Sequence, residues 1–216
     1  MKEYKLPIGC DVPETIILAD GDFPSHPLAL EWLRQCPYVV CCDGAANTYI
    51  RSGRMPEAIV GDGDSLLPDI KERYASLIHS EAEQETNDLS KAFRFCLSQE
   101  RKRITIMGAT GKREDHTIGN VSLLADYMEQ AEVSMMTDYG IFVPIREDSM
   151  FESYIGQQIS VFNMNSTALS AEGLAYPLSV FTNWWQGTLN EALARHFIIR
   201  TEGKLSLIHI SEPTRH

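Results

Sequence analysis

Between residues 15 and 137 the sequence alternates short apolar runs with longer amphipathic stretches, and this alternation limits the fold more than any other feature. The apolar runs lie at residues 15–19, 38–42, 58–60, 104–107 and 133–137. Amphipathic stretches at residues 26–36, 89–100 and 117–130 carry apolar residues at three- and four-residue spacing, which is typical of helices that pack on one face. Alternating strands and helices predict a doubly wound, mostly parallel sheet with helices on both faces.

After Asp138 the pattern changes to short segments that are rich in β-branched and aromatic residues and punctuated by Gly, Pro and Asn. These segments lie at residues 140–145, 150–155, 158–164, 167–174 and 176–182. They predict antiparallel strands in a small sandwich or barrel. The predicted fold class is therefore α/β, with an N-terminal domain at residues 1–138 followed by a small antiparallel β domain at residues 139–204.

The last residues of the chain need a separate interpretation. Residues 205–215 read LSLIHISEPTR, which resembles the translation of a transposase adapter used in sequencing-library preparation. A non-native tail at residues 205–216 would leave the chain without its natural C-terminus and without the last strand of the β domain. The alternative is an ordinary terminal strand formed by LSLIHI.

Composition argues against several classes of partner. The formal net charge of −11 opposes binding to nucleic acid, because phosphate neutralisation needs clustered Lys and Arg. The shares of hydrophobic residues (44%) and charged residues (23%) are ordinary for a soluble globular protein, and no segment is apolar over the length of a membrane span. The N-terminus lacks the apolar stretch of a signal peptide, and the five cysteines form no C-x-x-C pair and fit reduced thiols. We expect a cytoplasmic protein with no membrane partner.

Four polar segments stand where ligands gather in open α/β sheets, outside the carboxyl ends of the strands. Residues 42–47 (CDGAAN), 61–65 (GDGDS) and 108–116 (GATGKREDH) each follow a predicted strand, and residues 84–93 (QETNDLSKAF) open a predicted helix. We expect these segments to bring six charged residues to one rim of the sheet: Asp43, Asp62, Asp64, Asp88, Arg113 and Asp115.

Most of these residues have an ordinary structural explanation when each is taken alone. Asp43 precedes a glycine and suits a turn, Asp88 stands in a segment that suits a helix cap, and residues 113–115 suit a solvated turn plus a cap. Asp62 and Asp64 are harder to explain, because two carboxylates in one short segment repel each other. In an extended segment both would face one cation. Mg²⁺ prefers few carboxylates plus substrate phosphates, so the expected chemistry is metal-assisted phosphoryl or pyrophosphoryl transfer.

The four segments resemble, in order and spacing, the signature loops of the thiamine pyrophosphokinase family. The matching residues are DGAAN at 43–47, GDGDS at 61–65, QETNDLSKA at 84–92 and GKREDHTIGN at 111–120. Residues 173–178 (GLAYPL) also resemble a segment of the family's C-terminal domain, so the likeness runs from about residue 16 to residue 200. The resemblance implies a doubly wound α/β domain that binds ATP and Mg²⁺, followed by a β-sandwich that binds thiamine and forms dimers.

Members of that family transfer a pyrophosphoryl group from ATP to the hydroxyethyl oxygen of thiamine, releasing AMP, with Mg²⁺ as cofactor. The resemblance implies three metal-binding residues, which also act in catalysis: Asp62, Asp64 and Asp88. It implies two further catalytic residues: Arg113 and Asp115. The nucleotide-binding residues that it implies are Asp43, Asn47, Arg113, His116 and Asn120. The thiamine-binding residues that it implies are Gln84, Thr182 and Asn183, the last two from the partner subunit of a homodimer.

Three residues depart from the family pattern. Gly63 stands where Phe is common, and Ala45 and Lys112 stand where glycine is frequent. Lys112 would either help to bind phosphate or face solvent. Two other functions remain open at this point: another Mg-dependent phosphohydrolase or phosphotransferase, and a non-catalytic module that binds nucleotide or thiamine.

The adjacent tryptophans Trp184 and Trp185 bear on assembly. On a strand they would face opposite ways, so one would pack in the core of the β domain and the other would need a cover. That cover is either a second subunit or the chain's own α/β domain, and the family resemblance favours a homodimer.

Overall fold

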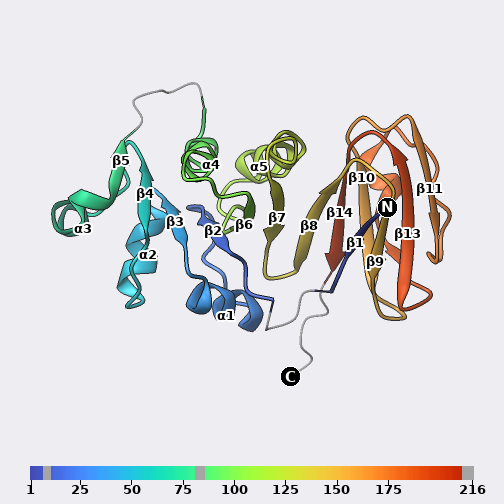
Figure 1. Cartoon of the computed structure of the whole chain (residues 1–216), viewed down its shortest axis with the longest axis horizontal. Coiled ribbons are helices and arrows are strands. Elements are labelled where there is room, and N and C mark those ends of the chain that lie inside the picture. The colour runs from blue at the N-terminus through green and yellow to red at the C-terminus, as the bar shows by residue number, and fades with distance from the viewer. Residues whose placement is uncertain (7–10, 81–85, 211–216) are drawn as a thin grey trace.

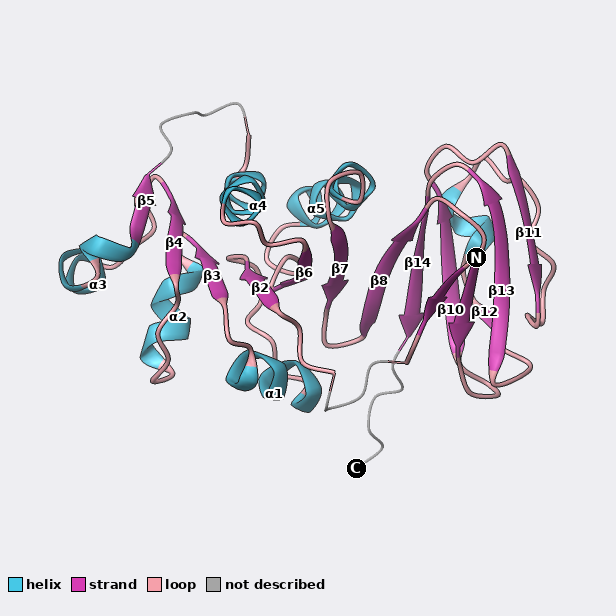
Figure 2. Cartoon of the chain, viewed as in Figure 1, coloured by secondary structure: helices cyan, strands magenta, loops and turns pink. Residues whose placement is uncertain are grey.

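The structure is a computed structural model of the chain, and it describes residues 1–6, 11–80 and 86–210 (Figure 1). Within these residues the strands form one sheet of ten strands and another of four. Helices lie against one half of the larger sheet, while the other half faces the smaller sheet (Figure 2). The fold is therefore an α/β part and a β-sandwich that share a sheet.

The parallel half of the ten-stranded sheet comes from the first 136 residues. Its strands are β2 (Thr15–Leu18), β3 (Val39–Cys42), β4 (Ala58–Gly61), β5 (Ile78–Ser80), β6 (Arg103–Met107) and β7 (Glu132–Met136). Their order across the sheet is β7-β6-β2-β3-β4-β5, and each neighbouring pair is parallel. Five of these strands lie at the predicted apolar runs, and β5 was not predicted.

Helices cover both faces of this parallel half. They are α1 (Pro27–Gln35), α2 (Ala45–Arg51), α3 (Pro68–Arg73), the short η1 (Ala75–Leu77), α4 (Asp88–Ser98) and α5 (Glu114–Tyr127). Ile16, Leu18 and Cys41 pack with residues of α1, α2 and α3, whereas Ile17 and Cys42 pack with residues of α4 and α5. Successive strand residues point to opposite faces, so strands that are apolar throughout need cover on both sides. The predicted doubly wound arrangement is confirmed.

The other half of the ten-stranded sheet is antiparallel. Its strands are β8 (Gly140–Ile145), β10 (Gln158–Asn163), β12 (Asn190–Glu191) and β14 (Leu205–Ile210). The second sheet holds β1 (Lys2–Tyr4), β9 (Ser149–Glu152), β11 (Ala168–Glu172) and β13 (His196–Glu202). Phe151 and Phe197 stack at 5.1 Å in the core that also buries Leu205 and Leu207. Two sheets with side chains packed between them form a sandwich rather than a barrel.

The ten-stranded sheet continues across the predicted boundary between residues 138 and 139. β7 pairs antiparallel with β8, with Met136 opposite Ile141, so the parallel and antiparallel halves are one sheet. The N-terminus also belongs to the sandwich, because β1 pairs with β9 and Lys2 lies opposite Ser149. No local pattern indicates a pairing between residues so far apart in sequence. The bounds 1–138 and 139–204 stay a prediction.

The start of the supposed tail forms a strand. β14 lies between β8 and β10, and its residues Leu205 and Leu207 are fully buried. The expectation that the last strand of the sandwich is missing is therefore wrong for this chain. Leu205 and Leu207 at alternate positions lie in the core of the sandwich, and Ser206 and His209 are buried as well, so most of the strand is covered. The adapter origin of residues 205–216 stays a prediction.

Residues 176–193 differ from the prediction. No strand forms at residues 176–182, where Tyr176 exchanges two hydrogen bonds with the side chain of Asn190. Trp184 and Trp185 lie in η2 (Trp184–Gly187), a short 3-10 helix, so their predicted placement on a strand is wrong. Both side chains are exposed, at 42% and 72%. We call residues 176–193 the apolar segment, because six large exposed side chains lie in it: Tyr176, Val180, Trp184, Trp185, Leu189 and Leu193.

The helices of the described residues are too short or too polar to cross a membrane. Within the same part of the chain the cysteines form no disulfide, and Cys41, Cys42 and Cys96 are buried. Burial raises the pKa of the Cys96 thiol to about 12, so it stays protonated near neutral pH. These buried cysteines pack as small apolar side chains.

Candidate active site

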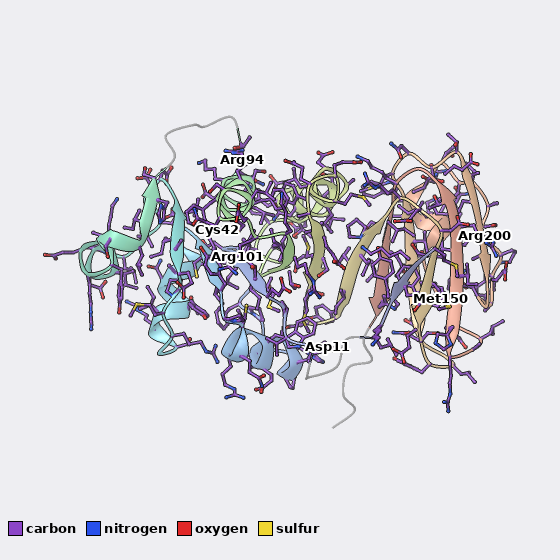
Figure 3. All side chains as sticks on the ribbon, viewed as in Figure 1. Asp11, Cys42, Arg94, Arg101, Met150 and Arg200 are labelled. Atoms are coloured by element: carbon purple, nitrogen blue, oxygen red, sulfur yellow. The ribbon has the colours of Figure 1, made fainter. Side chains whose placement is uncertain are left out.

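The carboxyl ends of β2, β3, β4 and β6 meet at one edge of the sheet, where loops 19–22, 43–44, 62–65 and 108–113 follow them. The start of α4 joins the same edge, because the Cys42 thiol at the end of β3 donates a hydrogen bond to the Asp88 carbonyl at 3.7 Å. Cys42 lies beneath α4 (Figure 3). We call this edge the acidic rim.

Asp43 is the buried carboxylate of the acidic rim. Its residue is 4% exposed, and its φ of 28° places it in the left-handed region. The Ser65 backbone N–H donates to Asp43 Oδ2 at 3.0 Å, but Asp43 Oδ1 is buried and has no partner. Burial, followed by the charges of Asp88 and Asp62, raises the pKa of this carboxyl. A buried, unpaired carboxylate oxygen favours a cation or a donor from a ligand.

The loop with Asp62 and Asp64 is a turn, not the extended segment we expected. Asp64 N–H donates to Asp62 Oδ1 at 3.0 Å, and Gly63 between them has a φ of 77°. Lys71 Nζ donates to the Gly63 carbonyl at 2.9 Å, and a Cβ at Gly63 would approach Lys71 Nζ to 3.2 Å. The glycine therefore suits both the turn and the bond from Lys71.

Asn47 fixes this loop to α2. Its Nδ2 donates to the Ser65 carbonyl at 2.8 Å, and its Oδ1 accepts from Leu67 N–H at 3.0 Å. Both ends of the side-chain amide thus bind the backbone after β4. Asn47 holds the loop in place, and its predicted contact with nucleotide remains a prediction.

Asp88 projects from the first turn of α4 and does not cap it. The cap is Asn87, whose Oδ1 accepts from Ser90 N–H at 2.9 Å. Asp88 Oδ1 instead lies 3.0 Å from Lys91 Nζ, and the Lys91 side chain is only 5% exposed. A buried ammonium needs such a partner. The cap predicted for this segment thus forms at Asn87, Asp88 lies in the first turn where the helix dipole favours an acid, and its carboxylate is held at the rim by Lys91.

Arg113 and Asp115 form a two-point ion pair at the start of α5. Arg113 Nε donates to Asp115 Oδ1 at 3.0 Å and Nη2 to Oδ2 at 2.5 Å. The bonded guanidinium lowers the pKa of Asp115 to about 2. Arg113 is at the N-cap position without a side-chain cap bond, and Asp115 lies inside the helix, so the side-chain cap predicted within residues 113–115 does not form. Both side chains are exposed to solvent.

Two predicted nucleotide residues follow on α5. The exposed His116 donates its backbone N–H to Asp115 Oδ1 at 2.9 Å. Asn120 is buried, its Nδ2 donates to the Ala109 carbonyl at 2.8 Å, and its Oδ1 accepts from Asn87 Nδ2 at 3.2 Å. Asn120 therefore joins the loop after β6 to the start of α4, which is a positioning role.

Sequence reasoning missed the acidic loop after β2. Residues 19–22 (ADGD) have the same D-G-D spacing as residues 62–64, and this signal was available. Gly21 N–H donates to the Gly108 carbonyl at 2.6 Å and Asp22 N–H to the Thr110 carbonyl at 2.8 Å. Asp20 Oδ1 lies 3.0 Å from Lys112 Nζ. A cavity of about 440 Å³ opens between Asp22, these loops and the start of β8.

Two of the three predicted thiamine residues lie on the sandwich, away from the acidic rim. Thr182 and Asn183 are exposed next to η2, whose Trp184 packs edge-on against Phe162 of β10 at 5.8 Å. Asn183 caps η2, and its N–H donates to Gln186 Oε1 at 3.1 Å. The third predicted thiamine residue, Gln84, lies outside the described residues.

The carboxylates of the rim are donors of the kind that Mg²⁺ prefers, and the unpaired Asp43 Oδ1 fits such a cation. Among the residues that the structure describes, however, no three His, Cys, Asp or Glu side chains converge on one metal position. The donor set fits Mg²⁺ by its chemistry, but it is not gathered into a site by the protein alone.

Two family models match the chain. "Thiamin pyrophosphokinase, catalytic domain" matches residues 29–136, and "Thiamin pyrophosphokinase, substrate-binding domain" matches residues 140–208. Together they include both parts of the fold and most of β14. The match to residues 205–208 agrees with the placement of that strand inside the sandwich.

Among curated proteins, the chain is 30% identical over 129 residues to thiamine pyrophosphokinase 1 of Oryza sativa subsp. japonica, a match over 48% of this chain and 49% of that protein. It is 34% identical over 86 residues to thiamine pyrophosphokinase of Bacillus subtilis, over 38% of this chain and 40% of that protein. The chain thus spans about half or less of the length of the curated relatives it matches.

Solved structures share the fold at low sequence identity. Thiamine pyrophosphokinase from Bacillus subtilis has a TM-score of 0.77 and 21% identity, with 92% of this chain and 99% of that chain covered. Yeast thiamin pyrophosphokinase has a TM-score of 0.79 and 16% identity, with 97% and 91% covered. With both of its halves matched by the family's two models and its fold shared with these structures, this chain belongs to the thiamin pyrophosphokinase family.

Proposed function

We propose that the chain transfers a pyrophosphoryl group from ATP to the hydroxyethyl oxygen of thiamine, giving thiamine diphosphate and AMP. The observation that carries this proposal is the acidic rim, where a buried Asp43 oxygen without a partner lies under the electrostatic influence of Asp62 and Asp88. A site so rich in negative charge accepts a polyphosphate only together with cations. ATP with Mg²⁺ supplies both.

The residues that would hold Mg²⁺ are Asp62, Asp64 and Asp88, with Asp43 beside them. When bound, the cation would neutralise charge on the phosphates of ATP. The chain itself arranges these carboxylates: Lys91 holds Asp88, Asn47 holds the loop after β4, and the N–H of Ser65 holds Asp43. This support explains why the rim tolerates several like charges close together.

Arg113 would stabilise the charge that develops on the transferring phosphates. Asp115 binds its Nε and Nη2, which fixes the plane of the guanidinium and leaves Nη1 for a ligand. Such a planar donor suits phosphoryl oxygens better than an ammonium does. His116 and Asn120 lie four residues apart on α5 and so share one face of that helix. Asn120 holds the loop after β6 through its bond to the Ala109 carbonyl.

Thiamine would be bound between two copies of the chain. η2 packs on β10, and the strands between β10 and β3 are β14, β8, β7, β6 and β2. Six steps across a sheet separate these strands by roughly 25–30 Å. Thr182 and Asn183 therefore cannot contact a ligand at Asp43 of their own chain. In a homodimer, the apolar segment of one copy would lie at the acidic rim of the other, which also covers its exposed tryptophans.

The test is incubation of the chain with ATP, Mg²⁺ and thiamine, followed by chromatography and ³¹P NMR. Equal amounts of AMP and thiamine diphosphate are expected, and both should vanish when EDTA removes the metal. A phosphohydrolase would release phosphate or pyrophosphate without thiamine. A non-catalytic module would bind ATP or thiamine without turnover. Either result contradicts the proposed transfer.

A further inference from the structure

Lys112 has a backbone conformation that lysine rarely adopts. Its φ is 54°, in the left-handed region, and Gly111 before it has a φ of 77°. A side chain at Gly111 would overlap the carboxylate of Asp22, so the loop cannot relax easily at that point. A glycine would adopt the Lys112 conformation without strain. The lysine therefore needs a reason other than backbone geometry.

The fold does not supply that reason. Lys112 Nζ lies 3.0 Å from Asp20 Oδ1, but both side chains are about half exposed. An ion pair in contact with solvent contributes little to stability, because water screens it and two long side chains lose freedom. The pair with Asp20 thus explains where the ammonium rests, but not why a lysine occupies a position that suits glycine.

The resting position of the ammonium is at the centre of the acidic rim. Asp20, its partner, lies against the start of α2, since a Cβ at Gly44 would approach Asp20 Oδ2 to 2.6 Å. Gly44 directly follows the buried Asp43, and Arg113 directly follows Lys112. The other cations described at the rim are held in place: Lys91 is buried against Asp88, Lys71 donates to the Gly63 carbonyl, and Arg113 is bound at two points by Asp115. Lys112 is held by one exposed contact.

We propose that Lys112 is a phosphate-binding residue, which leaves Asp20 when ATP arrives and contacts the polyphosphate. Asp20 holds the ammonium near its working position in the free protein and competes with ATP for it. The inference rests on the proposed function, because the anion it assigns is the nucleotide of that reaction. An oxygen of ATP replaces one of Asp20 at Lys112, and the Asp20 carboxylate, which is about half exposed, is then hydrated by solvent.

The experiment is isothermal titration of the full chain with ATP in the presence of Mg²⁺, together with thermal unfolding of each variant. Lys112→Gly removes the charge and the strain together. It should weaken ATP binding about fivefold, a modest loss typical of one solvent-exposed charged contact, while the unfolding temperature stays level or rises by about 2 °C. Lys112→Asn, which tolerates the left-handed region, should weaken binding equally, and Lys112→Arg should stay within about twofold of the parent.

A matched control is Glu100→Gly. Glu100 has a similar φ of 59° but precedes β6, at the amino edge of the sheet. This substitution should give the same thermal effect and leave ATP binding unchanged. Asp20→Asn removes the competitor and should tighten ATP binding about twofold.

Three results would overturn the inference. If Lys112→Gly binds ATP as tightly as the parent chain, Lys112 faces solvent only. If Asp20→Asn weakens ATP binding as much as Lys112→Gly does, Asp20 does not compete with phosphate for the Lys112 ammonium. If the parent chain binds no ATP, the proposed function fails as well, so the two failures are distinguishable.

Discussion

The acidic rim and the apolar segment 176–193 differ in how many of their side chains have a partner within the same chain. At the rim, the Asn47 and Asn120 side chains bind the backbone of neighbouring loops, and Lys91 pairs with Asp88 on its own helix. In the apolar segment, Trp185 is 72% exposed, although Asn183 caps η2 and Trp184 packs against β10. The loops of the rim are held in position by contacts within a single chain. The exposed apolar side chains of the segment are typical of a surface that binds a second copy of the chain.

The rim and the apolar segment, the two halves of the proposed site, therefore depend on different interactions. Positioning at the rim comes from hydrogen bonds within one chain, so it should survive when the protein is a monomer. Thiamine binding would come from the apolar segment, so it should depend on assembly. Substitutions in the two regions are therefore expected to fail in different ways.

The largest effect is expected at the rim. Asp64→Asn should reduce turnover about a thousandfold, because it removes a carboxylate that is proposed to face the phosphates and their cation. The fold should remain intact, since the side chain is exposed. Steady-state kinetics at saturating Mg²⁺ checks this. The exposed Asp69 on α3 gives the control, and Asp69→Asn should be near normal. Equal activity in both variants would remove Asp64 from the metal site.

The next effect concerns the apolar segment. Trp185→Asp places a charge on the surface that would be buried between copies, so the proposed dimer should dissociate and activity fall about a hundredfold. Light scattering coupled to gel filtration measures the mass, and titration measures ATP binding, which should change little. Met55 is similarly exposed but lies on the α/β part, so Met55→Asp is the control. If Trp185→Asp lost ATP binding together with assembly, the rim would not be independent of the apolar segment, and the comparison would be wrong.

A smaller effect is expected at Arg113. Arg113→Lys keeps the charge but loses the planar fork that Asp115 binds at two points, so kcat should fall about tenfold to a hundredfold. The KM for thiamine should hardly change, because the charge builds up in the transition state. Unchanged kcat with weaker thiamine binding would place Arg113 outside the reaction centre.

The smallest effect is thermal and concerns Asp43. Burial raises the pKa of its carboxyl, so the folded state binds the proton more tightly, and this contribution to stability is lost as pH rises through the folded pKa. Asp43→Asn, which keeps the acceptor for Ser65 and tolerates the left-handed region, should raise the unfolding temperature by about 2–4 °C at pH 7. The gain should shrink towards pH 4. A gain that is independent of pH would show that ionised Asp43 is not the source of the cost.

Local sequence patterns predicted the parts of this fold that depend on local periodicity. The parallel strands other than β5 and the helices α1, α4 and α5 follow from apolar spacing, and the rim follows from where those strands end. α2 and α3 were missed because helices of two turns or less show too little periodicity. β1 was missed because its partner β9 is nearly 150 residues away, and no local signal reports such a pairing.

The candidate site was predicted in part for the same reason. Asp43, Asp62 and Asp88 follow from their positions at the strand ends and the start of α4. Asp20 was overlooked, although its loop repeats the D-G-D spacing of residues 62–64 and also follows a predicted strand. The role of Asn47 as a bridge to residues 65 and 67 depends on the turn at Gly63, which sequence alone did not fix.

Mixing two inactive variants tests whether each active site is divided between two copies of the chain. Asp64→Asn damages the acidic rim, and Asn183→Asp damages the thiamine half without touching the rim of its own chain. If sites are shared, random reassociation of equal amounts gives mixed dimers that each contain one intact site, so the mixture should recover about a quarter of the parent activity. Recovery should appear only after the subunits exchange. A mixture no more active than the sum of its two components would contradict the account, because each site would then be complete within one chain.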